Sequence, residues 1–195
     1  MALPGAVLFP HALMPLFIFE PRYRAMLAHA LQGDRMFCVA LMKPGVEEAI
    51  SPRDFHETAG VGLVRACVGH DDGTSHLVLQ GLARVRLESF VQEQPFRIAR
   101  LGLAPETNRA APEIGERQRE LLELCARLPL PDPEARAKLG IQLAQIGDPV
   151  MLSDIIAHTF LRRPEHQQEV LAQADVVERL QILAVHLKAE WKNKA

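Results

Sequence analysis

Cysteine is scarce in this 195-residue chain: there are three, Cys38, Cys67 and Cys125, and they lie far apart in the sequence. Three scattered cysteines are too few for a disulfide framework. Each lies in an apolar stretch, where cysteine usually behaves as a small core residue. The sequence therefore favours a reducing compartment, and we expect the protein to be cytoplasmic.

A long hydrophobic run is missing as well. The most apolar stretch, residues 6–19, is shorter than the ~20 residues that a membrane-spanning helix needs. Pro10 and Pro15 interrupt it, and no basic residue precedes it, so it does not have the form of a signal peptide either. We therefore expect no membrane partner.

Charge of one sign does not accumulate anywhere in the chain. Lysine and arginine number 22 against 24 aspartates and glutamates, which gives a formal net charge of -2. Proteins that bind nucleic acid normally carry a basic face or stripe, and the sequence shows neither a basic cluster nor an acidic tail. The balance disfavours partners bound mainly through charge, and we expect no nucleic-acid partner.

The motifs of common catalytic sites are also absent. No segment has the Gly-x-x-x-x-Gly-Lys-Ser/Thr spacing with which backbone amides and a lysine hold phosphates. After Ser75, a leucine at position 77 stands where a nucleophile elbow needs glycine. We expect no catalytic residue and a protein that is not an enzyme; a small-molecule pocket between two subdomains is the weaker alternative.

Metal-binding residue types gather at one place, where Cys67 and His70 are followed by Asp71, Asp72 and His76. A tetrahedral metal site needs ligands that converge, whereas residues three apart on a strand point to opposite faces. A tight turn explains the two aspartates without a metal. We therefore expect no metal and no cofactor.

What the first half of the chain does contain is a series of short apolar runs broken by glycine, proline and aspartate. This pattern predicts strands over residues 37–42, 61–68, 76–82 and 84–90. Asp72-Gly73 predicts a tight hairpin, because glycine accepts a positive φ angle. In the last run Val85 alternates with Arg84 and Arg86, which predicts one buried face and one solvent face.

One helix is expected among these strands. Glu20 is placed to cap it, and Pro21 suits its first turn. Gly33 is expected to end it in a left-handed conformation. Residues 104–112 are polar and bounded by proline, which predicts a hinge after the strands.

Beyond the hinge the pattern is helical. Asp132 and Asp148 are each followed by proline, a pair that is typical of a capped helix start. Pro164 opens a further helix, and Asp175 is expected to cap the last one. The predicted fold class is therefore α+β, with a β-rich subdomain that contains one helix, followed by a small helical bundle.

Several segments along the chain have a distinctive sequence. Leu8-Phe9-Pro10 and residues 14–26 open the chain, and Gly60–Val64, Asp72-Gly73 and residues 79–85 follow them. The second half adds residues 153–157, 168–171 and 175–180. In this order, and over nearly the whole chain, these segments resemble the N-terminal domain of Lon proteases.

The resemblance implies a β-rich pseudo-barrel with one helix over residues 1–105 and a helical bundle over residues 106–195. It also implies recognition of unfolded or tagged polypeptides without catalysis. A Lon protease continues into an ATPase and a protease, whereas this sequence ends at Ala195. We therefore expect a free-standing polypeptide-binding domain, with a Lon-type protease as a possible partner.

An alternative is a protein-interaction or assembly module that regulates a Lon-type protease or another partner. The last helix favours it, because apolar residues recur three or four apart and could pack against a partner helix: Val176, Leu180, Leu183 and Leu187. Packing inside the bundle is the commoner use of such a stripe.

Capture of varied unfolded segments needs exposed apolar side chains that adapt to their partners, and methionine and phenylalanine supply these. The candidates lie at expected strand edges or in loops: Met14, Phe17, Met36 and Phe55. Phe55 is the strongest candidate, because burial does not readily explain an aromatic ring in the polar loop of residues 51–58. For Phe17, ordinary core packing is the simpler explanation.

Overall fold

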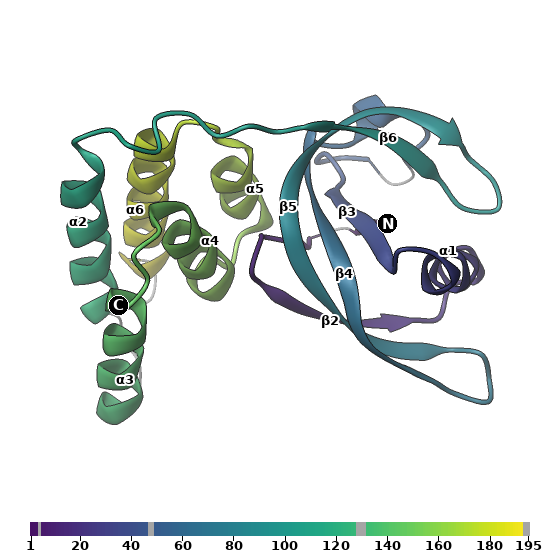
Figure 1. Cartoon of the computed structure of the whole chain (residues 1–195), viewed down its shortest axis with the longest axis horizontal. Coiled ribbons are helices and arrows are strands. Elements are labelled where there is room, and N and C mark those ends of the chain that lie inside the picture. Colours follow the sequence, from purple (N-terminus) through teal and green to yellow (C-terminus); the bar gives the residue numbers. More distant parts are fainter. Residues whose placement is uncertain (4, 47–48, 128–131, 193–195) are drawn as a thin grey trace. The chain divides into compact units, whose positions relative to one another are not determined.

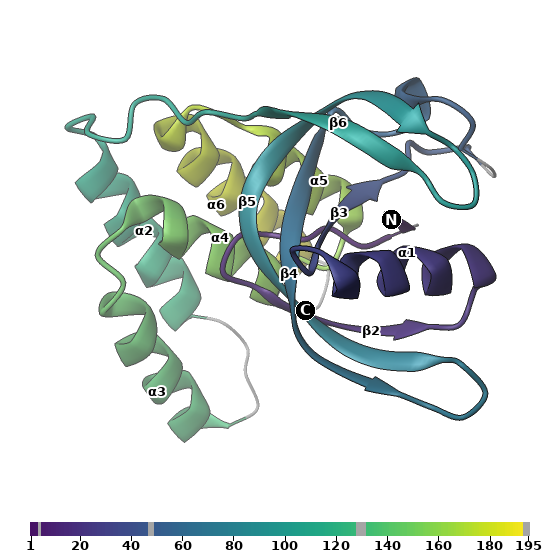
Figure 2. The same cartoon turned by 45° about the vertical axis from the view of Figure 1, so that its right-hand side comes forward.

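The computed structural model describes residues 1–3, 5–46, 49–127 and 132–192. The chain divides into two compact units, Met1–Ala104 and Pro105–Ala195, and Figures 1 and 2 label their helices and most of their strands. Within the described residues, no helix is both long enough and apolar enough to cross a membrane. That the two units are independent domains stays a prediction.

The first unit is a β-sheet with one α-helix. Its strands are β1 (Ala2–Leu3), β2 (Leu13–Ile18), β3 (Met36–Leu41), β4 (Thr58–Gly69), β5 (Ser75–Gln92) and β6 (Ile98–Leu103), with a 3-10 turn, η1 (Pro52–Asp54), before β4. The strand order is β1-β3-β4-β5-β2, and β6 also pairs with β5. β1 joins β3 in parallel, and the other pairs are antiparallel.

Two of the predicted strands, residues 76–82 and 84–90, are parts of one long strand, β5. Its first part, Ser75–Gln80, pairs with β2, and its second part, Val85–Gln92, pairs with β6. β5 curves along this length (Figure 1). The predicted α+β class is confirmed, and no pairing among the described strands joins β1 to β2 or β6, so the sheet does not close into a complete barrel. The sheet is open.

The β4–β5 hairpin confirms the predicted turn. Gly73 has a φ angle of 78°, and its N–H donates to the His70 carbonyl at 2.9 Å. The Asp72 carboxylate accepts hydrogen bonds from the Thr74 hydroxyl at 2.7 Å and from the Thr74 N–H at 2.9 Å. These bonds hold the pKa of Asp72 below its ordinary value. The turn itself therefore explains this aspartate.

Alternation along the strands gives the sheet two faces, of which the inner face is covered by α1 (Pro21–Gln32). In both views α1 lies in the hollow of the curved sheet (Figures 1 and 2). The inner face and the helix bury one another through Met14, Ile18, Phe37, Val39, Val64, Leu77 and Leu79 of the sheet and Tyr23, Met26, Leu27 and Ala30 of α1. This contact is the main core of the unit.

The second part of β5 departs from simple alternation. Val85 is buried and Arg86 is exposed, as predicted, but Arg84 is also buried, with 8% of its surface exposed. The expected solvent position of Arg84 is wrong, because both faces of β5 are covered at this point. The irregular pairing of β4 with β5 lies directly before it, between Val61 and Gly62.

The segment that opens the chain crosses the sheet over two glycines. A Cβ atom on Gly60 would lie 2.1 Å from the carbonyl oxygen of Leu8, and one on Gly81 would lie 1.9 Å from that of Phe9. The His11 N–H donates to the Gly81 carbonyl at 2.9 Å. The backbone of this segment therefore approaches β4 and β5 more closely than any side chain would allow, which explains both glycines.

The bounds of α1 agree with its predicted Pro21 start, but neither end is capped as expected. The Glu20 side chain accepts no capping hydrogen bond, because its carboxylate pairs with Arg22 at 2.8 Å. Gly33 has a φ angle of -108°, and the left-handed residue is Arg35, with a φ angle of 63°. Glu20 and Gly33 therefore stand at the two cap positions as predicted, but the expected side-chain cap and the left-handed conformation are wrong.

The second unit is a bundle of α2 (Ile114–Ala126), α3 (Pro133–Ala144), α4 (Pro149–Phe160), α5 (Pro164–Ala172) and α6 (Val176–Lys192). α6 contacts α2, α4 and α5. The stripe considered for a partner helix is almost completely buried, at no more than 1% exposure for each of Val176, Leu180, Leu183 and Leu187. This stripe therefore forms the core of the bundle and is not available to a partner.

Aspartate caps begin three of these helices, as predicted. The Asp132 carboxylate accepts the Glu134 N–H at 2.9 Å, and Asp148 accepts the Val150 N–H at 2.8 Å. Asp175 accepts two backbone N–H groups of the first turn of α6. Each of these bonds satisfies an amide that has no partner inside its helix.

The segment predicted as a hinge, residues 104–112, is partly fixed to the helical unit. The Thr107 N–H donates to the Ala174 carbonyl at 3.0 Å, and the Val176 N–H donates to the Thr107 carbonyl at 3.1 Å. These two bonds attach the segment to the start of α6. The expectation of a hinge over the whole segment is therefore wrong, because its middle part belongs to the bundle.

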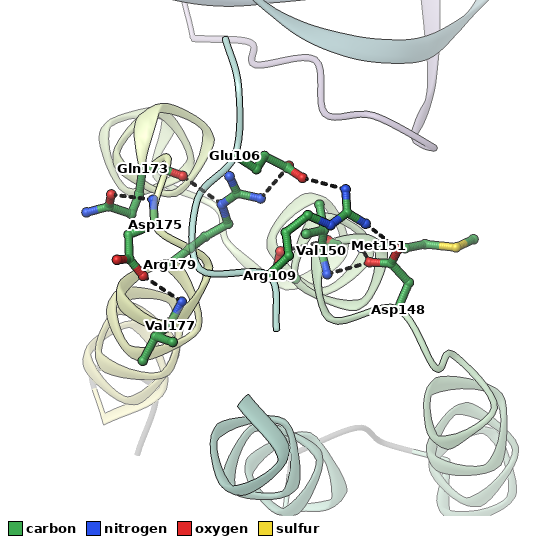
Figure 3. Close-up of polar contacts among 10 residues, drawn as sticks. Glu106, Arg109, Asp148, Val150, Met151, Gln173, Asp175, Val177 and Arg179 are labelled. Atoms are coloured by element: carbon green, nitrogen blue, oxygen red, sulfur yellow. Dashed lines mark hydrogen bonds and ion pairs between the residues drawn. The ribbon is translucent and has the colours of Figure 1, made fainter. Parts of the chain in front are cut away.

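A buried arginine strengthens this attachment (Figure 3). Arg179 is fully buried; its Nε donates to the Gln173 carbonyl at 2.8 Å, and its guanidinium pairs with the Glu106 carboxylate at 2.9 Å. The Arg109 guanidinium donates to the Glu106 carboxylate at 3.0 Å and to the Asp148 carboxylate at 2.7 Å. The linker thus connects the starts of α6 and α4.

The glycine contact can be tested by substitution. Gly81→Ala should lower the free energy of unfolding of the first unit by about 1–3 kcal/mol, because the new methyl group forces the Phe9 backbone away from β5. Gly69→Ala is the matched control: its nearest neighbouring atom, the Ser75 Oγ, lies 3.9 Å from the added Cβ. Urea denaturation measures both, and equal effects of the two changes would contradict the close approach.

The cap of α6 predicts a dependence of stability on pH. Hydrogen bonds, above all from the Glu178 N–H, hold the pKa of Asp175 below its ordinary value of 3.8. A lowered folded-state pKa stabilises the fold above pH 3.8, and this contribution is lost as the pH falls through the folded-state pKa. Asp175→Ala should therefore lower the melting temperature at neutral pH. Its difference from the unchanged protein, followed by circular dichroism, should shrink in acid; a difference that is constant with pH would contradict the cap.

Candidate functional site

The face of the sheet opposite α1 is apolar, and we call it the outer face. Its side chains come from four strands: Leu13, Pro15 and Phe17 of β2, Met36 of β3, Leu63, Ala66 and Val68 of β4, and His76, Val78 and Gln80 of β5. These positions alternate with the buried residues of the inner face, or pair across strands with residues that do. The outer face is therefore one continuous surface.

Strand register places these side chains in rows. One row runs from Leu13 through its partner Gln80 and then through Leu63 to Met36. Paired residues of neighbouring strands have their side chains on the same face, in contact or nearly so. The register thus brings together residues that are far apart in the sequence, from the first strands to the middle of β5.

Several large apolar side chains of this surface are in contact with solvent. The exposed fraction is 56% for Leu13, 48% for Phe17, 37% for Met36 and 62% for Val68. Phe19, just beyond β2, adds a side chain that is 58% exposed. Exposed apolar residues are common singly, but a group of them on one face is typical of an interaction site.

A row of rings fixes the position of Phe17. Its ring stacks on His76, with 4.6 Å between ring centres, and on Phe19, at 5.8 Å. His76 in turn meets His70, with 2.8 Å between Nδ1 of His76 and Nε2 of His70. One of these nitrogens donates and the other accepts, according to the tautomers of the two rings. The exposed ring of Phe17 is therefore held by neighbours on two sides.

Two of the four predicted binding residues lie on this face. Phe17 is half exposed, so its expected burial in the core is wrong, and Met36 lies at the other end of the surface. The sheet brings them to one face although 18 residues separate them along the chain. A binding role for these two residues stays a prediction.

The other two predicted residues are buried. Met14 points to the inner face and is 8% exposed. Phe55 is 3% exposed, packs in a second core cluster with Val85, and meets Phe90 edge to face at 5.9 Å. The expectation that Phe55 is exposed is wrong. The polar residues before it form η1, whereas the backbone of Phe55 pairs with that of Met42 in an isolated bridge.

Sequence reasoning missed most of the outer face. Residues 13–19 are apolar at every position, so the pattern is that of a strand buried on both sides. The alternation of exposed and buried residues in β2 appears only when the position of α1 is known. A signal was nevertheless present, since β2 is more apolar than a sheet with one solvent face requires.

The cysteines and the potential metal ligands of the described residues do not form a reactive site. Among the residues that the structure describes, no group of three or more His, Cys, Asp or Glu is arranged to hold a metal. Cys67 packs against the inner core, away from His70 and His76. Burial raises the pKa of Cys125 to about 12 and raises that of Cys38, so neither thiol is poised as a nucleophile at neutral pH.

Comparison with known proteins bears on what such a surface is for. The sequence model described as the ATP-dependent protease La (LON) substrate-binding domain matches residues 1–189. The chain belongs to this family. The predicted resemblance of the chain to Lon N-terminal domains is thereby confirmed.

Lon proteases are similar to the chain over nearly its whole length. The Lon protease of Dictyoglomus thermophilum is 28% identical over 190 residues, which cover 97% of this chain and 24% of that protein. The Lon protease of Azospirillum brasilense is 28% identical over 193 residues, which cover 94% of this chain and 23% of that protein. The Lon substrate-binding domain described here thus spans about a quarter of the length of these relatives.

Solved Lon N-terminal domains share the fold. The N-terminal domain of Mycobacterium avium complex Lon protease matches with a TM-score of 0.74 and 14% identity, covering 96% of both chains. A Lon N-terminal domain protein from Xanthomonas campestris matches with a TM-score of 0.65 and 18% identity, covering 94% of this chain and 95% of that one. At such low identity the likeness concerns the fold alone, and it confirms the α+β architecture.

Because the outer face is in contact with solvent, a substitution on it should change the free energy of unfolding less than a substitution on the inner face. Phe17→Ser should change the free energy of unfolding by less than about 1 kcal/mol, because Phe17 is already half in water. Leu79→Ala, on the inner face, should cost about 2–5 kcal/mol, since it leaves a cavity in a closed core. Urea denaturation of both variants measures the difference. A Phe17 variant as unstable as the Leu79 variant would show that the outer face is covered.

Proposed function

We propose that this domain binds unfolded or exposed polypeptide segments, and that the outer face holds them. The observation that carries the proposal is the group of exposed Phe, Met, Leu and Val side chains on one face of a domain from a substrate-binding family. The substrates of a protease are polypeptides. A domain of a Lon substrate-binding family is therefore expected to have a surface that contacts polypeptide.

The composition of the outer face supports a tolerant mode of binding. Met36 is flexible and polarisable, and the rings of Phe17 and Phe19 offer contact area that does not demand one partner sequence. The face is a sheet surface, so an extended segment can lay alternate side chains on it. Weak, roughly micromolar binding is expected of such contacts, because few of them are deeply enclosed.

The domain itself is proposed to act by binding and not by catalysis, in the cytoplasm and in the context of a Lon-type protease. The alternative of an assembly module lost its main support when the apolar stripe of α6 proved to be the core of the bundle. Delivery of bound segments to an ATPase and a protease belongs to the same proposal, since the chain corresponds to about a quarter of the Lon proteases it matches.

Titration against a fluorescently labelled, permanently unfolded protein tests the proposal. The unchanged domain should bind it saturably, and Phe17→Ser with Met36→Ser should weaken binding by about tenfold, which corresponds to ~1.4 kcal/mol of lost apolar contact. Fluorescence anisotropy measures the Kd.

Leu103→Ser is the matched control for these changes. Leu103 is 84% exposed but lies on β6, outside the outer face, so its loss should leave the Kd unchanged. Equal weakening by Leu103→Ser would show general stickiness and not a site. Absence of binding by the unchanged domain at high micromolar concentration would contradict the proposed function itself.

A further inference from the structure

The strand segments that build the outer face carry positive charge and no negative charge. The segments that build it, β2, β3, β4 and residues 75–80 of β5, contain no aspartate or glutamate. They do contain Arg65 and His76. Arg65 therefore has no carboxylate to balance its charge within these segments.

Arg65 lies at an irregularity of β4. The pairing of β4 with β5 shifts between Val64 and Ala66, so Arg65 is the extra residue of a bulge. Val64 points to the inner face and Ala66 is the partner of Val78 on the outer face. Arg65 is exposed, and no described carboxylate forms an ion pair with it.

A second arginine borders the same corner. Arg35 directly precedes Met36, and its Nε donates to the Val64 carbonyl at 3.3 Å. The Val64 N–H donates back to the Arg35 carbonyl at 2.8 Å. Arg35 is therefore held beside the residue that precedes Arg65, so both arginines lie next to the Met36 end of the sheet.

The acidic residues around the face are mostly engaged locally. Glu20, beyond β2, pairs with Arg22 at 2.8 Å. The Asp34 carboxylate accepts the Met36 N–H at 3.0 Å. Asp72 is bonded to Thr74 in the hairpin turn, and its exposed neighbour Asp71 lies at the tip of the hairpin, away from the arginine corner.

We infer that the outer face prefers apolar polypeptide segments that carry acidic residues beside the apolar stretch, and disfavours segments with lysine or arginine there. This inference rests on the proposed function. Arg35 and Arg65 would attract a carboxylate that flanks the segment, while the apolar strands take its hydrophobic side chains. A flanking lysine at this corner would meet two arginines against the single carboxylate of Asp34.

The charge of the whole chain predicts the opposite preference. With a formal net charge of -2, long-range attraction would favour cationic peptides over acidic ones. A preference for acidic flanks can therefore come only from the local pattern of the surface. This opposition makes the sign of the preference a direct test.

The experiment uses three labelled, unstructured peptides that share one apolar core and differ in their flanks, which are aspartate, serine or lysine. The expected order of affinity is aspartate, then serine, then lysine, with a ratio of about 3- to 10-fold between the extremes, as suits exposed ion pairs. The ratio should shrink in 1 M salt, where the screening length is about 3 Å.

Two charge variants locate the effect. Arg65→Glu should abolish or reverse the order, while Arg119→Glu, an equal change of net charge at an exposed position of α2, should leave it intact. Equal binding of the three peptides, a preference for lysine, or an order that survives Arg65→Glu would each overturn the inference and leave the proposed function standing. Failure of all three peptides to bind would overturn both.

Discussion

A β-strand sends successive side chains to opposite faces of its sheet, and in the first unit a single helix covers only one of those faces. The rest of the unit depends on this constraint. The inner face packs against α1 through Met14 and Ile18 of β2 and Leu77 and Leu79 of β5. The apolar residues of β2 that alternate with Met14 and Ile18 therefore face the other way. An open sheet with apolar residues on both faces is thus left with one face that the unit does not bury.

Glycine allows this arrangement to be compact. The opening segment lies on Gly60 and Gly81 because those positions have no side chain, and it brings β2 into register with β5 directly afterwards. The family resemblance of the opening segment therefore has a structural cause: the fully buried Leu8 and Phe9 fix the start of the strand whose other residues form the outer face. Packing and surface are specified by the same stretch of sequence.

Much of this fold could be predicted from the sequence, and the failures have a common origin. The hairpin at Gly73 and the aspartate caps are local features, determined by residues that are neighbours in the chain, and they were predicted correctly. Burial is decided by distant partners. Phe55 looked exposed because its loop is polar, but it packs with Val85 from a distant part of the chain. Phe17 looked buried because its surroundings are apolar, but α1 covers only the opposite face of β2.

Binding of unfolded polypeptide to the outer face of the sheet, as proposed, would place the contact on four strands of the first unit. NMR spectra of the isotopically labelled domain, recorded while an unlabelled unfolded protein is added, test this most directly. The shifted amide signals should belong to β2 at Leu13, Met14, Leu16 and Phe17, and to Met36, Ala66–Val68 and His76–Gln80, with α1 and the helical unit unaffected. Shifts confined to the helical unit, or to β6 around Leu101 and Leu103, would contradict it.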